Sequence, residues 1–133
     1  MSASRADRLE RLRALQGRRR EMEEWRLAAL ERRAGELKAE AEEILHSLGA
    51  HSPLAGLFLE AKAQRLRRKE AERADVLRQA EETRKAAREA AAVEKRLERL
   101  GTQARSVENA EAESRSLADL LDAHLASRRA SLE

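Results

Sequence analysis

The segment Gly49-Ala50-His51-Ser52-Pro53 decides the fold, because it gathers the helix-ending and helix-starting signals of a chain otherwise rich in helix formers. Gly49 can adopt the left-handed conformation that closes a helix C-terminus. Ser52 can cap the next helix with its hydroxyl, and Pro53, the only proline, suits the first helical position, where no N–H is needed. We therefore predict three successive segments: a helix over residues 4–48, a turn over residues 49–52 and a helix over residues 53–131.

The composition on both sides of this turn favours helices. Ala, Arg, Glu, Leu and Lys supply 96 of the 133 residues, and all five favour helix formation. Three Val, one Ile and two Thr are too few to cover the faces of a sheet. With one Phe, one Trp and no Tyr, the chain can form a thin seam between helices but not a thick core. The predicted fold is all-α: a single antiparallel two-helix coiled-coil hairpin over residues 1–133, with a longer second helix.

Steps of three and four residues mark the seam of each predicted helix. In the first helix the seam consists of Leu27, Leu30, Ala34, Leu37, Ala41, Ile44 and Leu48. In the second it consists of Val76, Gln79, Thr83, Ala86, Ala90, Val93, Leu97, Leu100, Ala104 and Val107, and it continues to Leu125. Leu9, Leu12, Leu15 and Met22 are out of phase with Leu27, so we predict a stutter between Gly17 and Arg26. Trp25 is then expected to pack half-buried along the seam.

A short connection makes the two helices antiparallel neighbours, with residue i opposite roughly residue 102 − i. This register places acidic residues of the first helix (Glu36, Glu40, Glu42 and Glu43) opposite basic residues of the second (Lys62, Arg65, Arg67, Arg68 and Lys69). It also leaves about 35 C-terminal residues without a partner in the chain, although their apolar stripe continues. We expect this overhang either to fold back at Gly101-Thr102, the expected position of any second break, or to dock on another chain.

Several functional classes are excluded by absent signals. The chain has no Cys and no nucleotide-binding, metalloprotease or serine-hydrolase motif, so we predict no enzymatic activity, cofactor, metal or small-molecule substrate. His46 and His51 flank the turn but lack further metal ligands nearby. No apolar run approaches the roughly 20 residues of a membrane span, and no signal peptide precedes the first helix. We therefore expect a cytoplasmic protein.

Three surfaces are candidate binding sites. The N-terminal segment carries seven arginines against Asp7 and Glu10, and it can bind an acidic protein, bind phosphates or simply be solvated. Because it lacks aromatic stacking platforms, we expect a protein partner rather than nucleic acid. The predicted partner-binding residues are Arg5, Arg8, Arg11, Arg13, Leu117, Leu120, Leu121 and Leu125. At the hairpin tip, an apolar group that includes Leu54, Leu57 and Phe58 either closes the hairpin or docks on a partner.

The chain resembles the flagellar FliJ family and its YscO counterparts of type III secretion. The shared features are the Arg/Glu/Ala/Leu-rich arms, the break at Gly49-Ala50-His51-Ser52-Pro53 and a longer second arm containing Ala104-Arg105-Ser106-Val107-Glu108-Asn109-Ala110-Glu111. The resemblance implies a stalk that enters a hexameric export ATPase, contacts the export gate and escorts export chaperones, peripheral to the inner membrane through these partners. It places one set of leucines toward the ATPase: Leu9, Leu12, Leu15, Leu117, Leu121 and Leu125.

Two other functions remain open on the residues alone. One is a self-associating structural coiled coil, a homo-oligomer in which two overhangs pair antiparallel. The other is a basic nucleic-acid adaptor, whose affinity would fall steeply as salt rises.

Overall fold

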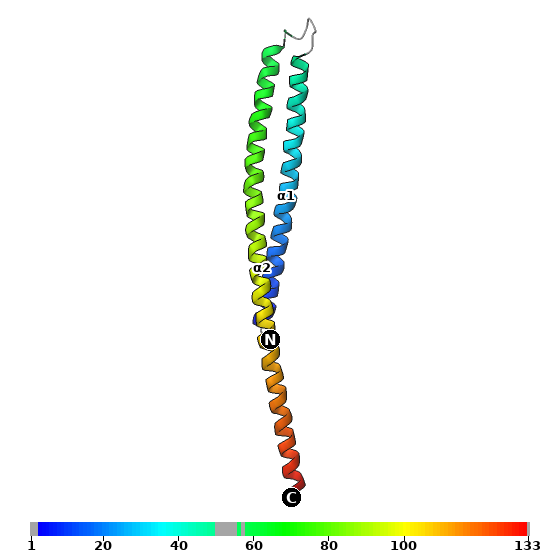
Figure 1. Ribbon diagram of the computed structural model, residues 1–133, viewed down its shortest axis with the longest axis vertical. Coiled ribbons are helices and arrows are strands. Elements are labelled where there is room, and N and C mark those ends of the chain that lie inside the picture. Colours follow the sequence, from blue (N-terminus) through cyan, green and yellow to red (C-terminus); the bar gives the residue numbers. More distant parts are fainter. Residues whose placement is uncertain (1–2, 50–55, 57, 133) are drawn as a thin grey trace. The chain divides into compact units, whose positions relative to one another are not determined.

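A computed structural model describes residues 3–49, 56 and 58–132. It contains two helices, α1 (Arg5–Leu48) and α2 (Leu59–Leu132), and no strand among the described residues (Figure 1). Ion pairs join Glu31 to Arg84 and the later Glu40 to the earlier Lys69, so α1 and α2 run antiparallel. The predicted all-α hairpin with a longer second helix is confirmed.

The bounds of α1 follow from its caps. Ser4 Oγ accepts a hydrogen bond from the backbone N–H of Asp7 at 3.1 Å, so Ser4 is the N-cap. At the other end, the N–H of Gly49 is shared between the carbonyls of Leu45 (3.3 Å) and His46 (3.2 Å). Gly49 has no positive φ, so it ends α1 without the left-handed conformation that its identity suggests.

The second helix begins later than predicted and is not interrupted. Gly56 and Phe58 lie in turns and α2 starts at Leu59, whereas the sequence suggests a start at residue 53. Residues 50–53, which include Ser52 and Pro53, lie outside the described residues. At the suspected second break, Gly101 and Thr102 are helical, and Thr102 Oγ1 donates to the carbonyl of Glu98 at 3.0 Å. This hydrogen bond to the preceding turn is how a threonine hydroxyl is satisfied inside a helix.

The chain divides into two compact units, whereas the sequence predicts a single hairpin over residues 1–133. The hairpin unit is Gly17–Ala91, and the terminal unit combines Met1–Gln16 with Ala92–Glu133. Each unit contains part of α1 and part of α2.

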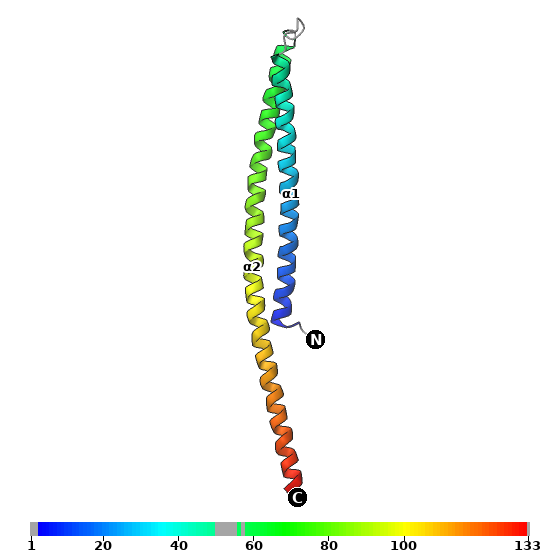
Figure 2. The same ribbon diagram turned by 45° about the vertical axis from the view of Figure 1, so that its right-hand side comes forward.

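In the hairpin unit the two helices lie side by side in both views and bury a narrow seam (Figures 1 and 2). Leu37 is fully buried, and it clusters with Ala34 and Val76, with Leu30 packed against them. On α1, every predicted seam position between Leu27 and Leu48 is buried or half-buried, as expected.

On α2 the predicted seam is half right. Val76, Thr83 and Ala90 are buried as predicted, but the positions between them are Ala80 and Ala87, one residue later than predicted. Of the other two positions predicted within the hairpin unit, Gln79 is exposed and Ala86 is half-buried. The chosen face buries alanine and leaves the amide of Gln79 in water, which avoids the cost of burying an unpaired polar group.

The register is also shifted from the prediction. Glu40 pairs with Lys69 at 2.9 Å, Arg33 with Glu72 at 2.9 Å and Arg84 with Glu31 at 3.0 Å. Residue i therefore lies opposite roughly residue 110 − i, because the connection ending at Leu59 is longer than a four-residue turn. Since these side chains keep 28–53% of their surface in solvent, the pairs fix register and orientation more than they add stability.

The predicted stutter near Trp25 is wrong. Arg20, Glu23 and Leu27 are half-buried and continue the same spacing of three and four residues. Met22 and Trp25 are 69% and 77% exposed, so Trp25 does not line the seam. The long aliphatic stems of Arg and Glu can line an inward position when their charged ends reach water.

The terminal unit pairs the first turns of α1 with α2 from about residue 94 to Glu108 (Figure 2). Ala6 is buried, and Leu9, Leu97 and Ala104 are half-buried. Glu108 is the last residue with partial burial, and every residue of 109–132 is exposed. The overhang therefore begins about ten residues later than predicted, as the shifted register requires.

Candidate protein-docking site

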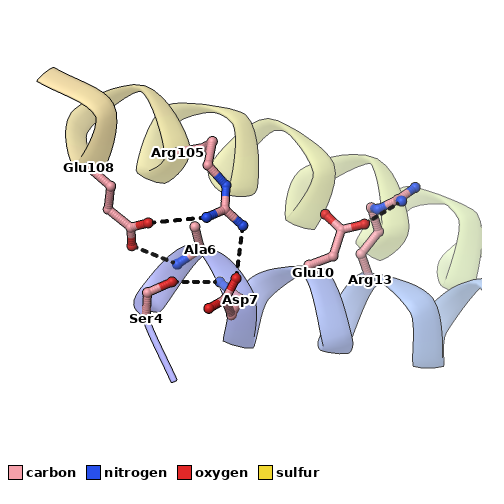
Figure 3. Close-up of polar contacts among 7 residues, drawn as sticks. All are labelled: Ser4, Ala6, Asp7, Glu10, Arg13, Arg105 and Glu108. Atoms are coloured by element: carbon pink, nitrogen blue, oxygen red, sulfur yellow. Dashed lines mark hydrogen bonds and ion pairs between the residues drawn. The ribbon is translucent and has the colours of Figure 1, made fainter. Parts of the chain in front are cut away.

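The first turn of α1 donates a hydrogen bond to a side chain of α2. The backbone N–H of Ala6, one of the first N–H groups of the helix, donates to Glu108 Oε1 at 3.2 Å (Figure 3). A carboxylate is favoured there because the N-terminal N–H groups carry the positive end of the helix dipole. Ser4 caps the same turn from within α1. The start of α1 is thus anchored to one position on α2.

Arg105 of α2 completes this anchor. Its Nη2 lies 2.9 Å from Asp7 Oδ1 and its Nη1 lies 3.4 Å from Glu108 Oε2 (Figure 3). The hydrogen bond from Arg105, followed by one from Ser4, lowers the pKa of Asp7, and the bond to Asp7 raises the pKa of Arg105. We call Ser4, Asp7, Arg105 and Glu108 the terminal clasp.

The predicted arginines beside the clasp differ in availability. Arg5, Arg8 and Arg11 are exposed, and within the described part of the chain none of them forms an ion pair. Arg13 is half-buried and pairs with Glu10 at 2.8 Å, a hydrogen bond that raises the pKa of Arg13. Three of the four predicted arginines therefore present an unengaged guanidinium to solvent.

Apolar side chains of α2 lie next to Arg5. A shallow hollow of about 380 Å³ is lined by Arg5 together with Leu100, Val107 and Glu111. Leu100 and Val107, which the sequence analysis placed in the seam, are 41% and 56% exposed, because the seam uses the neighbouring face of α2. Leu12 is seven residues from Arg5, so it projects from the same side of α1, and it is 49% exposed.

The four predicted leucines lie on the overhang and face solvent. Leu117, Leu120, Leu121 and Leu125 are 60%, 66%, 55% and 53% exposed. At about 100° per residue, Leu117, Leu121 and Leu125 share one face of α2, and Leu120 projects from its side. We call these three residues the leucine stripe.

The structure places the arginines and the leucines in one unit but not side by side. Glu108 lies opposite the first turn of α1, and Leu117 lies about 13 Å farther along the axis of α2, beyond the end of α1. The neighbours of Arg5 are instead Leu100 and Val107, which the site prediction did not include. Arg105 and Glu108 were missed as well, because only the observed register places Arg105 beside Asp7 and Glu108 beside the N–H of Ala6.

At the hairpin tip, some of the described apolar residues are buried and others are exposed. Ile44 is buried and Leu48 half-buried, consistent with closure of the hairpin end. Leu45, Phe58 and Leu59 are 52%, 61% and 53% exposed. Leu54 and Leu57 lie outside the described residues.

The described residues contain no metal-binding cluster and no membrane-spanning stretch. Among the described residues, no three His, Cys, Asp or Glu side chains lie where they could hold a metal ion. Neither described helix has a stretch that is apolar and long enough to span a membrane. Comparison with protein-family models, with curated proteins and with solved structures finds no match.

Proposed function

We propose that this protein is a non-enzymatic coiled-coil adaptor that docks on a protein partner through its terminal unit. The observation that carries the proposal is the overhang: α2 continues over residues 109–132 beyond its last half-buried residue, with the leucine stripe exposed. An apolar stripe on a helix of a soluble protein is stabilised when another surface covers it. The hairpin unit serves as a spacer. The terminal clasp holds the start of α1, with its arginines, against the part of α2 that precedes the overhang.

The partner that we propose is the hexameric ATPase of a bacterial flagellar or type III protein-export apparatus, with the export gate and export chaperones as further partners. The support is the resemblance of the charged arms, the turn segment and the longer second arm to FliJ and YscO stalks. In this role the protein works in the cytoplasm and reaches the inner membrane through its partners. The exposed arginines Arg5, Arg8 and Arg11 accelerate association with an acidic surface, and the leucines are buried on docking.

The test is a binding measurement with a purified export ATPase. Replacing Leu117 and Leu121 with Ser should weaken binding at least about 100-fold, because a fully buried leucine contributes about 1.5–3 kcal/mol. Leu45→Ser is the matched control, since Leu45 is similarly exposed but lies in the hairpin unit, and it should bind as the parent does. Parent-like binding by the double variant, together with loss of binding in Phe58→Ser, would show that the tip is the docking end.

A further inference from the structure

The overhang has an apolar face over most of its described length, with Ser114 and Arg128 as the polar positions on it. Leu117, Leu121 and Leu125 form the leucine stripe, and at 100° per residue Ala110 and Leu132 extend it toward both ends. Leu132 is the most exposed large apolar residue of the described chain, at 87%. Residues 109–132 span roughly 36 Å, a little more than three heptads, which is long enough for a short coiled coil.

The outermost charges of the overhang are ordered along its length, and Arg115, Asp119 and Asp122 lie between them. Glu111 and Glu113 stand at the N-terminal side of the leucine stripe, and Arg128 and Arg129 at its C-terminal side. None of these four side chains forms an ion pair within the described residues. Two such helices side by side in parallel would place acid beside acid and base beside base. In the antiparallel orientation, the acidic end of each helix meets the basic end of the other.

From this ordering we infer that the overhang binds a second copy of itself, as an antiparallel two-helix coiled coil centred on Leu121. With Leu121 opposite its own symmetry mate, Leu117 faces Leu125 and Ala110 faces Leu132. Glu111 lies on the same flank of the stripe as Arg129 of the other copy, about 3 Å from it along the axis. The interface is isologous and therefore closes as a dimer rather than growing into a filament. One register thus satisfies both the apolar stripe and the charges.

This dimer forms in the free protein and does not depend on the proposed function. If that function is also correct, the dimer buries the same leucines that dock on the partner. Docking then requires the dimer to dissociate, and the leucine stripe is covered in both states.

Cysteine crosslinking tests the register, because the natural chain has no Cys. A disulfide forms only where the two Cα atoms approach within about 7 Å. Leu121→Cys should therefore form a disulfide-linked dimer on mild oxidation, whereas Leu117→Cys and Leu125→Cys should each remain largely uncrosslinked. An equal mixture of these last two variants should give the crosslinked heterodimer. Ala123→Cys, on the opposite face of the helix, is the matched control and should not crosslink.

Charge reversal and mass measurement test the same dimer without a covalent bond. Light scattering of the unmodified chain should show the mass rising from monomer to dimer between micromolar and millimolar concentration. Glu111→Arg and Arg129→Glu should each raise the dissociation constant about fivefold, since symmetry places two such pairs in each dimer. The double variant should restore the affinity of the parent.

Two results would overturn the inference. One is a monomeric mass over the whole concentration range, which would leave the leucine stripe free for a different protein and the docking proposal intact. The other is equal crosslinking of the three single leucine variants with themselves, which would indicate a parallel pair. A dimer that shows no affinity for the export ATPase would refute the proposed function alone.

Discussion

Replacing Gly101 with Ala should stabilise the terminal unit. Gly101 is half-buried in an unbroken stretch of α2, and a Cβ built there would lie 3.8 Å from Leu9 Cβ, an ordinary van der Waals distance. Alanine in a helix interior is favoured over glycine by about 0.8–1.0 kcal/mol, and half-burying one methyl group adds about 0.4 kcal/mol. The free energy of unfolding should therefore rise by about 1.2–1.4 kcal/mol.

Gly35→Ala is the matched control for this substitution. Gly35 is exposed in α1, and its added Cβ would meet no atom within 4 Å, so only the helix-propensity gain of about 1 kcal/mol is expected. Urea unfolding followed by circular dichroism measures both variants, and amide hydrogen exchange locates the gain near residue 101. If Gly35→Ala stabilises the chain while Gly101→Ala destabilises it, α2 is broken or differently packed at residue 101, and the observed register is wrong.

Three further substitutions test the seam, the exposed tryptophan and the clasp. Leu37→Ala should lower the free energy of unfolding by about 2–4 kcal/mol in urea unfolding, because Leu37 is fully buried and truncation leaves a cavity. Trp25→Ala should change it by less than about 0.5 kcal/mol, since Trp25 is 77% exposed; a larger loss would restore the predicted half-buried position. The lowered pKa of Asp7 means that the clasp stabilises the fold fully above the unfolded pKa near 3.9 and loses this effect as pH falls through the lower folded value. Asp7→Asn should remove that part of the acid dependence, as measured by unfolding at a series of pH values between neutral and strongly acidic.

The fold class was predictable because composition and periodicity both indicate helices. The bounds of α1 follow from the capping signals Ser4 and Gly49, and its seam from Leu27 to Leu48 follows from the spacing of Leu, Ile and Ala. On α2 that spacing is ambiguous, because Ala86 and Ala87 are equally small and either can face inward. The register could not be predicted either, since it depends on the length of the connection before Leu59.

The candidate site was predictable only in part, because some of its contacts depend on the register of the two helices. The exposure of Arg8, Arg11 and Leu121 follows from charge patterning and from the unequal lengths of the helices. The contact of Arg105 with Asp7 does not, because an error of a few residues in register pairs Asp7 with a different turn of α2. Whether these residues bind a partner stays a prediction.

The half of α1 that precedes Leu27 shows why a helical seam does not always follow the largest apolar side chains. Within the hairpin unit, α1 turns Arg20 and Glu23 inward and leaves Met22 and Trp25 in water. Because the seam must stay in phase with Leu27 along a continuous helix, moving Met22 inward would require a local change in helix pitch. The buried positions of α2 in this unit include alanines such as Ala87, so little apolar area would be gained by that change. The outward Met22 and Trp25 are therefore the cost of keeping the seam of the hairpin unit in a single phase.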